Sequence, residues 1–449
     1  MSNALTTNGA GLGDGIDVAS MVASELAPMQ QPITALEDQQ TTLSQESQTL
    51  SAINSGLVAL HSDVQQFTNI DGAFSAKTAS SSDDSQLTAT ANPLATVASH
   101  TIVVTKLAST ASYGTNTSLA TADTTFGTGT FNIQVGNNAA VPITVTSSNN
   151  TLNGLATTID GMTNLGVTAT VYTDAKGAHL SIVSNQSGAA SDITIDPTSN
   201  TTGLTFQKGA TGADAQLTVD GLSIDSASNT ISTVIPGVTL NLTDANATPV
   251  TLTVAPDTSS MTSAVNTFVS DYNVIISAIN NQFAYDPNSG QAPSPLQGDT
   301  NLQLLQQQLF NDVSYSMSGN SGVVNLESLG VSMGDDGTLT VDSSTLTNQI
   351  STNAAAVSNF FQGTTTSWGQ NFNNDLYKIT NTTTGILNVD MTGITNTQTS
   401  LTSQINDMEA NLATQQTQLT NEYDSVDTTL EELPNTLATI NSELSGLKG

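Results

Sequence analysis

Heptad repeats of apolar residues at both ends of the chain limit what it can fold into. Near the amino terminus, one apolar position recurs at strict seven-residue steps and is occupied by Leu36, Leu43, Leu50, Leu57 and Val64. The companion position three residues later is apolar in the last three heptads but holds Gln39 and Glu46 in the first two. Such a half-filled pattern predicts a long helix that buries little apolar area alone and gains order from a partner.

The carboxyl-terminal end carries the same kind of repeat. Seven consecutive heptad positions are apolar, namely Ile405, Leu412, Leu419, Val426, Leu433, Ile440 and Leu447. After polar Gln415 and Glu422, the companion positions become apolar again at Leu430, Leu437 and Leu444. Pro434 is expected to kink or divide this helix, because proline lacks a backbone N–H and clashes with the preceding turn. The repeat predicts a second long helix that also needs a partner.

The sequence between these helices changes to a period of two. Segments such as TIVVTKLA, TFNIQVG and PVTLTVA alternate apolar and polar residues, which predicts short strands over residues 77–256. Asp220-Gly221 indicates a type I′ hairpin, and Asp174–Gly177 indicates a second one. A helical period returns at 259–283 and again at 299–315, and a hairpin is expected around Asp335–Gly337.

We expect an α+β, multidomain fold in which long, coiled-coil-like terminal helices and a helical bundle bracket inserted β-rich domains. Each terminal helix is the nearest candidate partner for the other. The expected domains are a partly disordered terminal region, a mainly helical bundle, a β-rich domain and an outer β-rich domain. Their boundaries, in that order, are 1–42 plus 411–449, 43–76 plus 257–410, 77–105 plus 212–256, and 106–211. Residues 1–15 are polar and glycine-rich and are expected to be disordered.

Charge and composition exclude several classes of partner. Six basic residues, all lysines, stand against 38 acidic ones, which gives a net charge of -32. Nucleic-acid binding draws its affinity from basic side chains, and an anionic membrane surface repels such a chain. No stretch approaches the roughly 18 apolar residues of a membrane-spanning helix. Cysteine is absent, which excludes disulfides, and the first residues lack the pattern of a secretory signal peptide.

Candidate catalytic and metal-binding residues are scattered. The three histidines, His61, His100 and His179, have no metal-ligand spacing. No G-x-S-x-G nucleophile motif or phosphate-binding loop occurs, and the adjacent acids Asp335-Asp336 indicate a turn rather than a glycosidase pair. We therefore expect no enzymatic activity, no cofactor and no metal site.

Three segments resemble the flagellar filament cap proteins, also called hook-associated protein 2. Residues 11–64 carry the family's glycine-rich element, matched by Gly13, Gly15, Ile16, Asp17 and Val18, followed by Pro32 and the leucine heptads. Residues 126–195 resemble a β-rich repeat shared with flagellins. Residues 212–254 resemble the family's most specific signature, which is matched by Asp214, Ala215, Val219, Asp220, Gly221, Ser228, Asn229, Ile231, Ile235, Gly237, Val238, Thr239 and Leu240. The sequence departs from many relatives at Glu431–Pro434, where they have methionine.

The resemblance implies a structural cap at the distal tip of the bacterial flagellar filament. Such a cap promotes folding and insertion of exported flagellin and prevents its loss to the medium. The implied partners are flagellin, hook–filament junction proteins, further copies of the chain in a ring-like homo-oligomer, and a type III export chaperone. The protein is expected to be secreted without a cleaved signal peptide and to act at the filament tip. The candidate assembly seam comprises Ile16, Val18, Leu36, Leu43, Leu50, Leu412, Leu419, Val426, Leu433, Leu437, Ile440, Leu444 and Leu447.

Other interpretations compete with this one. The heptads could form only an intramolecular bundle core. The chain could also be a secreted adhesin whose β domains bind glycans or host surfaces, although neither a signal peptide nor an anchor is evident in the sequence. A glycan-cleaving enzyme would need a pair of spaced carboxylates that the sequence does not reveal. Flagellin and hook–filament junction proteins are the relatives most easily confused with a cap, and the 212–254 segment argues against both.

Overall fold

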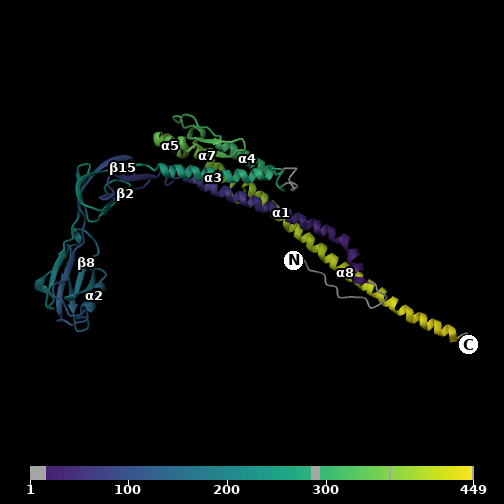
Figure 1. Ribbon diagram of the computed structural model, residues 1–449, viewed down its shortest axis with the longest axis horizontal. Helices are drawn as coiled ribbons and strands as arrows, with labels where there is room; N and C mark the ends of the chain where they lie inside the picture. Colours follow the sequence, from purple (N-terminus) through teal and green to yellow (C-terminus); the bar gives the residue numbers. More distant parts are fainter. Residues whose placement is uncertain (1–16, 285–293, 364–365, 447–449) are drawn as a thin grey trace. The chain divides into compact units, whose positions relative to one another are not determined.

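The computed structural model describes residues 17–284, 294–363 and 366–446 (Figure 1). The chain divides into two compact units that alternate along the sequence. The helical unit comprises Met1–Thr68, Ala264–Gln349 and Ala355–Gly449, and the β-rich unit comprises Asn69–Ser263 and Ile350–Ala354. Long helices at the two ends with β-rich segments inserted between them confirm the expected α+β, multidomain fold. Residues 1–15, for which the sequence predicts disorder, lie outside the described residues.

Helices make up most of the helical unit, and one short helix, α2, belongs to the β-rich unit. In chain order, the helices are α1 (Val18–Thr68), α2 (Leu152–Asp160), α3 (Thr258–Phe283), α4 (Thr300–Val313), α5 (Ser343–Thr352), α6 (Ala354–Gln362), α7 (Trp368–Ile379) and α8 (Ile386–Gly446). The helices predicted at 259–283 and 299–315 are confirmed as α3 and α4. Pro434 does not divide α8, which continues through it to Gly446. Proline removes one backbone hydrogen bond, and the remaining hydrogen bonds of this 61-residue helix keep it continuous.

The core of the helical unit contains a cluster of packed aromatic rings. Trp368 stacks on Phe360 with ring centroids 5.6 Å apart, and it meets Phe372 edge-on at 5.3 Å. Its indole Nε1–H donates a 2.8 Å hydrogen bond to the backbone oxygen of Asp312, so the buried polar group has a partner. Phe67, near the end of α1, packs 4.8 Å from Phe361. These contacts fix the carboxyl-terminal half of α1 within the unit.

The β-rich unit is built almost entirely from antiparallel strands. Its strands are β1 (Lys77–Ser81), β2 (Leu87–Ala91), β3 (Ala98–Lys106), β4 (Ser112–Thr115), β5 (Gly129–Val135), β6 (Val141–Val145), β7 (Val167–Asp174), β8 (Gly177–Ser184), β9 (Ile193–Ile195), β10 (Phe206–Ala210), β11 (Ala215–Val219), β12 (Leu222–Ser226), β13 (Thr230–Ile231), β14 (Val238–Leu242) and β15 (Asn246–Pro256). A separate hairpin of β16 (Val331–Met333) and β17 (Leu339–Val341) belongs to the helical unit.

Two separate hydrophobic clusters organise these strands. One joins the five-stranded sheet β1-β15-β3-β11-β12 and the three-stranded sheet β13-β14-β2, with Leu217 and Leu240 among its buried members. The other joins the sheets β10-β4-β8-β7 and β6-β5-β9 with α2, around Phe131 and Leu180. In both clusters the alternating apolar residues of most strands face inward, as their period of two predicts, whereas Leu222 of β12 is exposed.

The predicted turns are confirmed. Asp220 and Gly221 connect β11 and β12 with φ angles of 51° and 84°, the two positive values that a type I′ turn requires. The carboxylate of Asp220 also links the turn to β3, since its Oδ1 accepts a 2.9 Å hydrogen bond from the backbone N–H of Thr101. Asp174 and Gly177 pair at the end of β7 and β8, and the hairpin at Asp335–Gly337 joins β16 and β17.

Candidate assembly interface

The terminal helices α1 and α8 lie side by side and run in opposite directions (Figure 1). Two side-chain hydrogen bonds define how they are aligned. Gln40 Nε2 donates to Thr402 Oγ1 at 2.8 Å, and the Tyr423 hydroxyl donates to Glu25 Oε2 at 2.7 Å. The α8 residue nearer the carboxyl terminus, Tyr423, contacts the α1 residue nearer the amino terminus, Glu25, so the two helices are antiparallel. Each terminal helix is therefore a partner of the other, as the heptads suggest.

A small apolar cluster closes the end of this helix pair. Val18, Val22 and Leu26 are buried, and the partly buried side chains packed against them are Leu412, Leu419 and Tyr423. The sequence patterns do not single out Val22, Leu26 or Tyr423 as interface residues. Tyr423 lies seven residues before Leu430, so extending that heptad series backward by one step would identify it. The hydrogen bond to Glu25 and partial desolvation raise the pKa of Tyr423, which keeps the hydroxyl protonated as a donor.

Helix α1 has a defined start at this cluster. The side-chain oxygen Oδ1 of Asp17 accepts a 3.0 Å hydrogen bond from the backbone N–H of Ser20. Aspartate in this position caps a helix, because it satisfies a backbone donor that has no partner within the helix. Ile16, the seam residue predicted just before this cap, lies outside the described residues. The described part of α1 therefore begins seven residues before Glu25, the residue that Tyr423 of α8 contacts.

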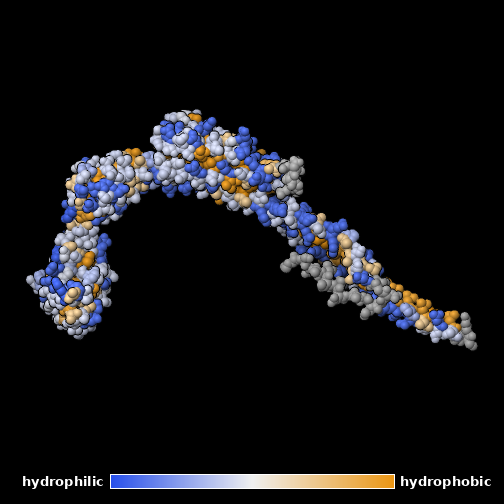
Figure 2. Space-filling view, in the orientation of Figure 1, coloured by the Kyte–Doolittle hydropathy of each residue, from blue (hydrophilic) through white to orange (hydrophobic). Residues whose placement is uncertain are grey.

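Helix α8 continues beyond the start of α1, and most of its apolar side chains from Val426 onward are exposed, whereas Leu430 is half-buried and Asp427 is buried. The exposed fractions are 45% for Val426, 46% for Leu433, 53% for Leu437, 46% for Ile440 and 53% for Leu444. Figure 2 shows hydrophobic side chains gathered along this end of α8. We call residues 426–444 of α8 the free seam. Leu447, the last predicted seam residue, lies outside the described residues.

The predicted seam residues thus fall into two groups. Val18 and Leu50 are buried within the chain, and Leu36, Leu43, Leu412 and Leu419 are half-buried. These side chains stabilise the helical unit and are largely covered by it. The residues that present apolar surface are Val426, Leu433, Leu437, Ile440 and Leu444. The seven-residue spacing is the same in both groups, so this spacing alone does not distinguish them.

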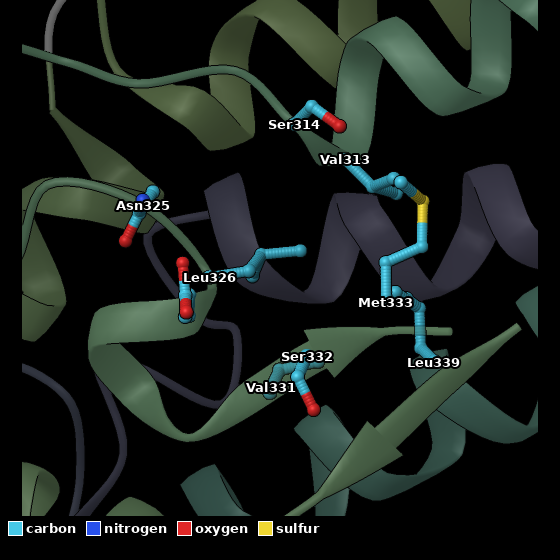
Figure 3. A pocket seen from close by; sticks show the side chains of 9 residues that line it. Val313, Ser314, Asn325, Leu326, Val331, Ser332, Met333 and Leu339 are labelled. Carbon is cyan, nitrogen blue, oxygen red and sulfur yellow. The ribbon is translucent and has the colours of Figure 1, made fainter. Parts of the chain in front are cut away.

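A pocket of about 270 Å³ lies beside the β16–β17 hairpin (Figure 3). Its wall is mixed, with apolar Val313, Leu326 and Met333 next to polar Ser314 and Asn325. Glu327 is the one ionisable side chain among the residues that line it. A single carboxylate without a neighbouring base does not form an acid–base pair, so this arrangement offers no catalytic chemistry of that kind.

Two of the three histidines each lie beside one aspartate. His100 Nδ1 lies 2.8 Å from Asp220 Oδ2, and His179 Nε2 lies 3.5 Å from Asp174 Oδ1. Burial lowers the pKa of His61. Within the part of the chain that the structure describes, no three histidine or acidic side chains converge as metal ligands. None of the helices in the described ranges is long and apolar enough to cross a membrane.

Two buried carboxylates in the helical unit sit beside other acids. Burial, together with the charge of Asp271, raises the pKa of Asp63 to about 6. Burial and the charge of Asp375 raise the pKa of Asp312 to about 7, although Gln308 Nε2 donates a 3.0 Å hydrogen bond to its Oδ1. Asp375 is itself bound by Lys378, with Nζ 2.6 Å from Oδ1. Asp63 and Asp312 belong to the helical unit and do not border the free seam.

Comparison with known proteins identifies the family. Residues 14–111 match the family described as Flagellar hook-associated protein 2 N-terminus, and residues 212–435 match Flagellar hook-associated protein 2 C-terminus. The B-type flagellar hook-associated protein 2 of Pseudomonas aeruginosa is 30% identical, over 96% of this chain and 95% of that protein. The flagellar hook-associated protein 2 of Escherichia coli strain K12 is 26% identical, over 95% of each chain.

A solved structure agrees in fold as well as in sequence. The crystal structure of the D1-D2-D3 domains of the flagellar cap protein from Escherichia coli superposes with a TM-score of 0.62 at 26% identity. The alignment covers 77% of this chain and 99% of that structure. Both the sequence relatives and this structure agree with the resemblance carried by residues 11–64 and 212–254. The chain belongs to the flagellar hook-associated protein 2 family, the cap proteins of the bacterial flagellar filament.

Proposed function

We propose that this protein caps the distal tip of the flagellar filament, where it promotes folding and insertion of exported flagellin and prevents flagellin loss to the medium. The free seam is the observation that carries the proposal. A row of exposed Leu, Ile and Val at heptad spacing is unfavourable in water and is typical of a helix that packs on another helix. A structural protein that fastens itself to other subunits needs such a surface, and an enzyme does not.

The proposed partners follow from this role. They are flagellin, the hook–filament junction proteins and further copies of this chain in a ring-like oligomer, with a type III export chaperone before secretion. The protein acts outside the cell at the filament tip, and we propose that it arrives there without a cleaved signal peptide. An export route that requires an unfolded chain suits a sequence without cysteine, because no disulfide can form before export.

The β-rich unit is proposed to contain two domains. The two hydrophobic clusters support a boundary of this kind, because one gathers residues between Ala111 and Leu204 and the other gathers residues on both sides of that range. We retain residues 106–211 as one domain and residues 77–105 plus 212–256 as the other. The terminal region, 1–42 plus 411–449, and the bundle, 43–76 plus 257–410, would then take in the helical unit together with residues 69–76, 257–263 and 350–354 of the β-rich unit.

The first test uses a deletion of the gene in the organism that encodes it, complemented with plasmid-borne variants. Without the protein, we expect flagellin monomers in the medium, filaments that are absent or very short, and lost swimming. Wild-type protein should restore all three properties. Normal filaments in the deletion strain would contradict the proposal and would favour the adhesin interpretation.

The second test addresses the free seam itself. The double variant Leu437→Asp/Ile440→Asp puts two charges into the apolar row, whereas Thr439→Asp places one charge on the opposite face of the same helix turn. We expect the double variant to be secreted but to leave flagellin in the medium, and the Thr439→Asp control to restore swimming. Full restoration by the double variant would show that the free seam has no role in capping.

A further inference from the structure

The two hydrophobic clusters of the β-rich unit follow one another along the chain without a spacer. We call the cluster that contains Leu217 the inner cluster and the cluster that contains Phe131 the outer cluster. Ala108 is buried in the inner cluster, and Ala111, three residues later, is buried in the outer cluster. Domains that move independently are usually joined by exposed, flexible linkers that few contacts cross. The connection between these two clusters is too short to be such a linker.

The outgoing connection is bonded to the returning one. The backbone N–H of Ser109 donates a 2.9 Å hydrogen bond to the oxygen of Ala213, and the Ala213 N–H donates one of 3.1 Å to the oxygen of Ser109. The Ser109 hydroxyl also donates a 3.0 Å hydrogen bond to the backbone oxygen of Thr211. A residue pair that exchanges two such bonds is the unit of an antiparallel ladder. The two connections therefore form one short bridge.

The loop between β8 and β9, residues 185–192, adds a third segment to this junction. The Ser187 hydroxyl donates a 2.6 Å hydrogen bond to the backbone oxygen of Ala227, just after β12. The backbone N–H of Gly188 donates one of 3.1 Å to the oxygen of Ser109. Gly188 has φ of 103°, and a Cβ there would lie 2.7 Å from the Cβ of Ala227. Only glycine lets the loop come this close.

Two polar side chains that follow the returning connection hold the other segments in place. Asp214 Oδ1 accepts a 2.7 Å hydrogen bond from the backbone N–H of Ala189. Asn229 binds both backbone groups of Ala108, because its Oδ1 accepts from the N–H at 2.7 Å and its Nδ2 donates to the oxygen at 3.0 Å. Both residues belong to the 212–254 segment, whose resemblance to the family has no structural reason in the sequence alone.

A charged pair fixes the end of the returning connection. Asp192 Oδ2 lies 2.6 Å from Lys208 Nζ, and Asp192 Oδ1 accepts a 3.0 Å hydrogen bond from the backbone N–H of Gly212. A Cβ at Gly212 would lie 2.7 Å from the backbone oxygen of Gly188, so the returning connection and the 185–192 loop are in close contact. The pair is partly exposed, and its main effect is on geometry.

We propose that Gly188, Asp214 and Asn229 form a junction lock that makes the two β domains one rigid arm. A hinge needs a single segment about which the chain can turn. Here three segments meet, and rotation about any one of them would break hydrogen bonds of the other two. A rigid arm passes a force on the outer domain directly to the inner one, whereas a hinged arm bends. This inference rests on the proposed division of the β-rich unit into two domains and does not depend on the role at the filament tip.

Spin labels can test the lock, because the chain has no other cysteine to label. In the full-length protein, Thr88→Cys on β2 and Thr170→Cys on β7 replace exposed side chains, one in each domain. We expect double electron–electron resonance to give one narrow distance distribution for this labelled protein. Adding Asp214→Ala and Asn229→Ala together should broaden the distribution at least twofold. Equal widths with and without these two substitutions would overturn the proposal.

Two control variants make the comparison specific. Asn149 also binds two backbone groups, but both lie within the outer domain, at Thr146 and Thr144. Asn149→Ala should therefore leave the width unchanged. Asp214→Asn keeps an oxygen acceptor for the N–H of Ala189 and should give the narrow distribution of the unaltered lock. If Asn149→Ala broadened the distribution as much as the lock variants do, the cause would be general loosening of the unit, and the lock would be disproved.

Hydrogen exchange of the same proteins separates the lock from the division into domains. In water, residues around Leu240 and around Phe131 should stay protected in the double variant. In denaturant, these two regions should lose protection at different concentrations in the double variant and at closer concentrations in the unaltered protein. Should the double variant unfold in water, Asn229→Ala alone carries the same expectations.

The failures of the two proposals differ in this experiment. If both regions of the lock variant lose protection at one denaturant concentration, the division into two domains is wrong, and the lock fails with it. If they unfold separately while the distance distribution keeps its original width, the division stands and the lock alone is wrong. Because the purified protein is measured, either result holds whether or not the variants support swimming.

Discussion

Tyr423 donates its hydroxyl hydrogen bond to Glu25 across 398 residues of sequence, with the two oxygens 2.7 Å apart. This contact lies close to the start of α1, which begins seven residues before Glu25, whereas α8 continues to Gly446. Before Tyr423, apolar residues of the two helices cover one another. From Leu433 onward, the apolar residues of α8 at the same heptad spacing are exposed.

Replacing Tyr423 with Phe should test how much this exposed hydrogen bond contributes. The ring would still pack on Val22 and Leu26, and only the hydroxyl would be lost. Because exposed polar contacts exchange readily with water, we expect little change in amide protection over residues 412–426. Tyr423→Ala, which removes the ring as well, should increase hydrogen exchange in both helices. Equal effects of the two substitutions would mean that the hydrogen bond, and not the apolar contact, holds the helices together.

Leu26→Ala should loosen the end of the helix pair without unfolding the rest of the unit. Leu26 is 3% exposed, and truncating a buried leucine costs about 2–5 kcal/mol. The loss of stability should fall at the lower end of this range, because two helices in contact can partly close around the cavity that the alanine leaves. Hydrogen exchange should rise in residues 18–30 and 412–426 while the region around Phe67 stays protected. Met29→Ala, at a side chain that is 40% exposed, is the matched control and should have little effect.

Asp312→Asn should stabilise the helical unit at neutral pH. The folded protein keeps the Asp312 proton up to about pH 7, whereas an unfolded aspartate releases it near its ordinary pKa of 3.8. The folded state thus binds more protons between these values, so the Asp312 contribution to the free energy of unfolding falls as pH rises through that window. The amide of asparagine does not ionise and removes this loss. Denaturant unfolding near pH 8 should show a gain of about 2 kcal/mol that shrinks toward pH 4.

Asp342→Asn should show the opposite dependence and serves as the comparison. Hydrogen bonds from Ser344 and Thr345 lower the pKa of Asp342 to about 2, which stabilises the folded protein above the ordinary pKa of aspartate. That contribution disappears as pH falls toward 2. The variant should therefore be less stable than wild type at neutral pH, with the difference closing in acid. If both variants shifted stability in the same direction, the charge environment assigned to Asp312 would be wrong.

Two glycines with left-handed backbones should differ in how they tolerate alanine. Gly221 has φ of 84° and no atom near a would-be Cβ, so Gly221→Ala should cost only the backbone strain of about 1–2 kcal/mol. Gly237 has φ of 78°, and its Cβ would lie 2.6 Å from the backbone nitrogen of Ala95. Gly237→Ala should therefore lower the melting temperature of the β-rich unit clearly more than Gly221→Ala. Equal effects would show that the chain around Ala95 moves aside without cost.

The sequence predicts the helices and turns of this chain better than it predicts which of them pack together. Seven-residue steps from Leu36 to Val64 and from Ile405 to Ile440 are enough to predict both terminal helices, and Asp220-Gly221 is enough to predict its turn. Periodicity shows that one face of a helix is apolar, but it does not show what covers that face. The alignment of α1 with α8 depends on contacts between residues about 400 positions apart, such as Glu25 and Tyr423. The aromatic core around Trp368 cannot be predicted from the pattern either, because its rings come from separate helices.

Pro434 provides the last prediction, because it lies within the free seam next to Leu433. Proline in a helix removes one backbone hydrogen bond and costs about 3 kcal/mol, so this end of α8 is less stable than its heptads alone would make it. Pro434→Ala should restore the N–H donor to the carbonyl of Leu430 and slow hydrogen exchange over residues 430–446. Faster exchange in Pro434→Ala would contradict this account, because it would mean that the proline stabilises the helix end.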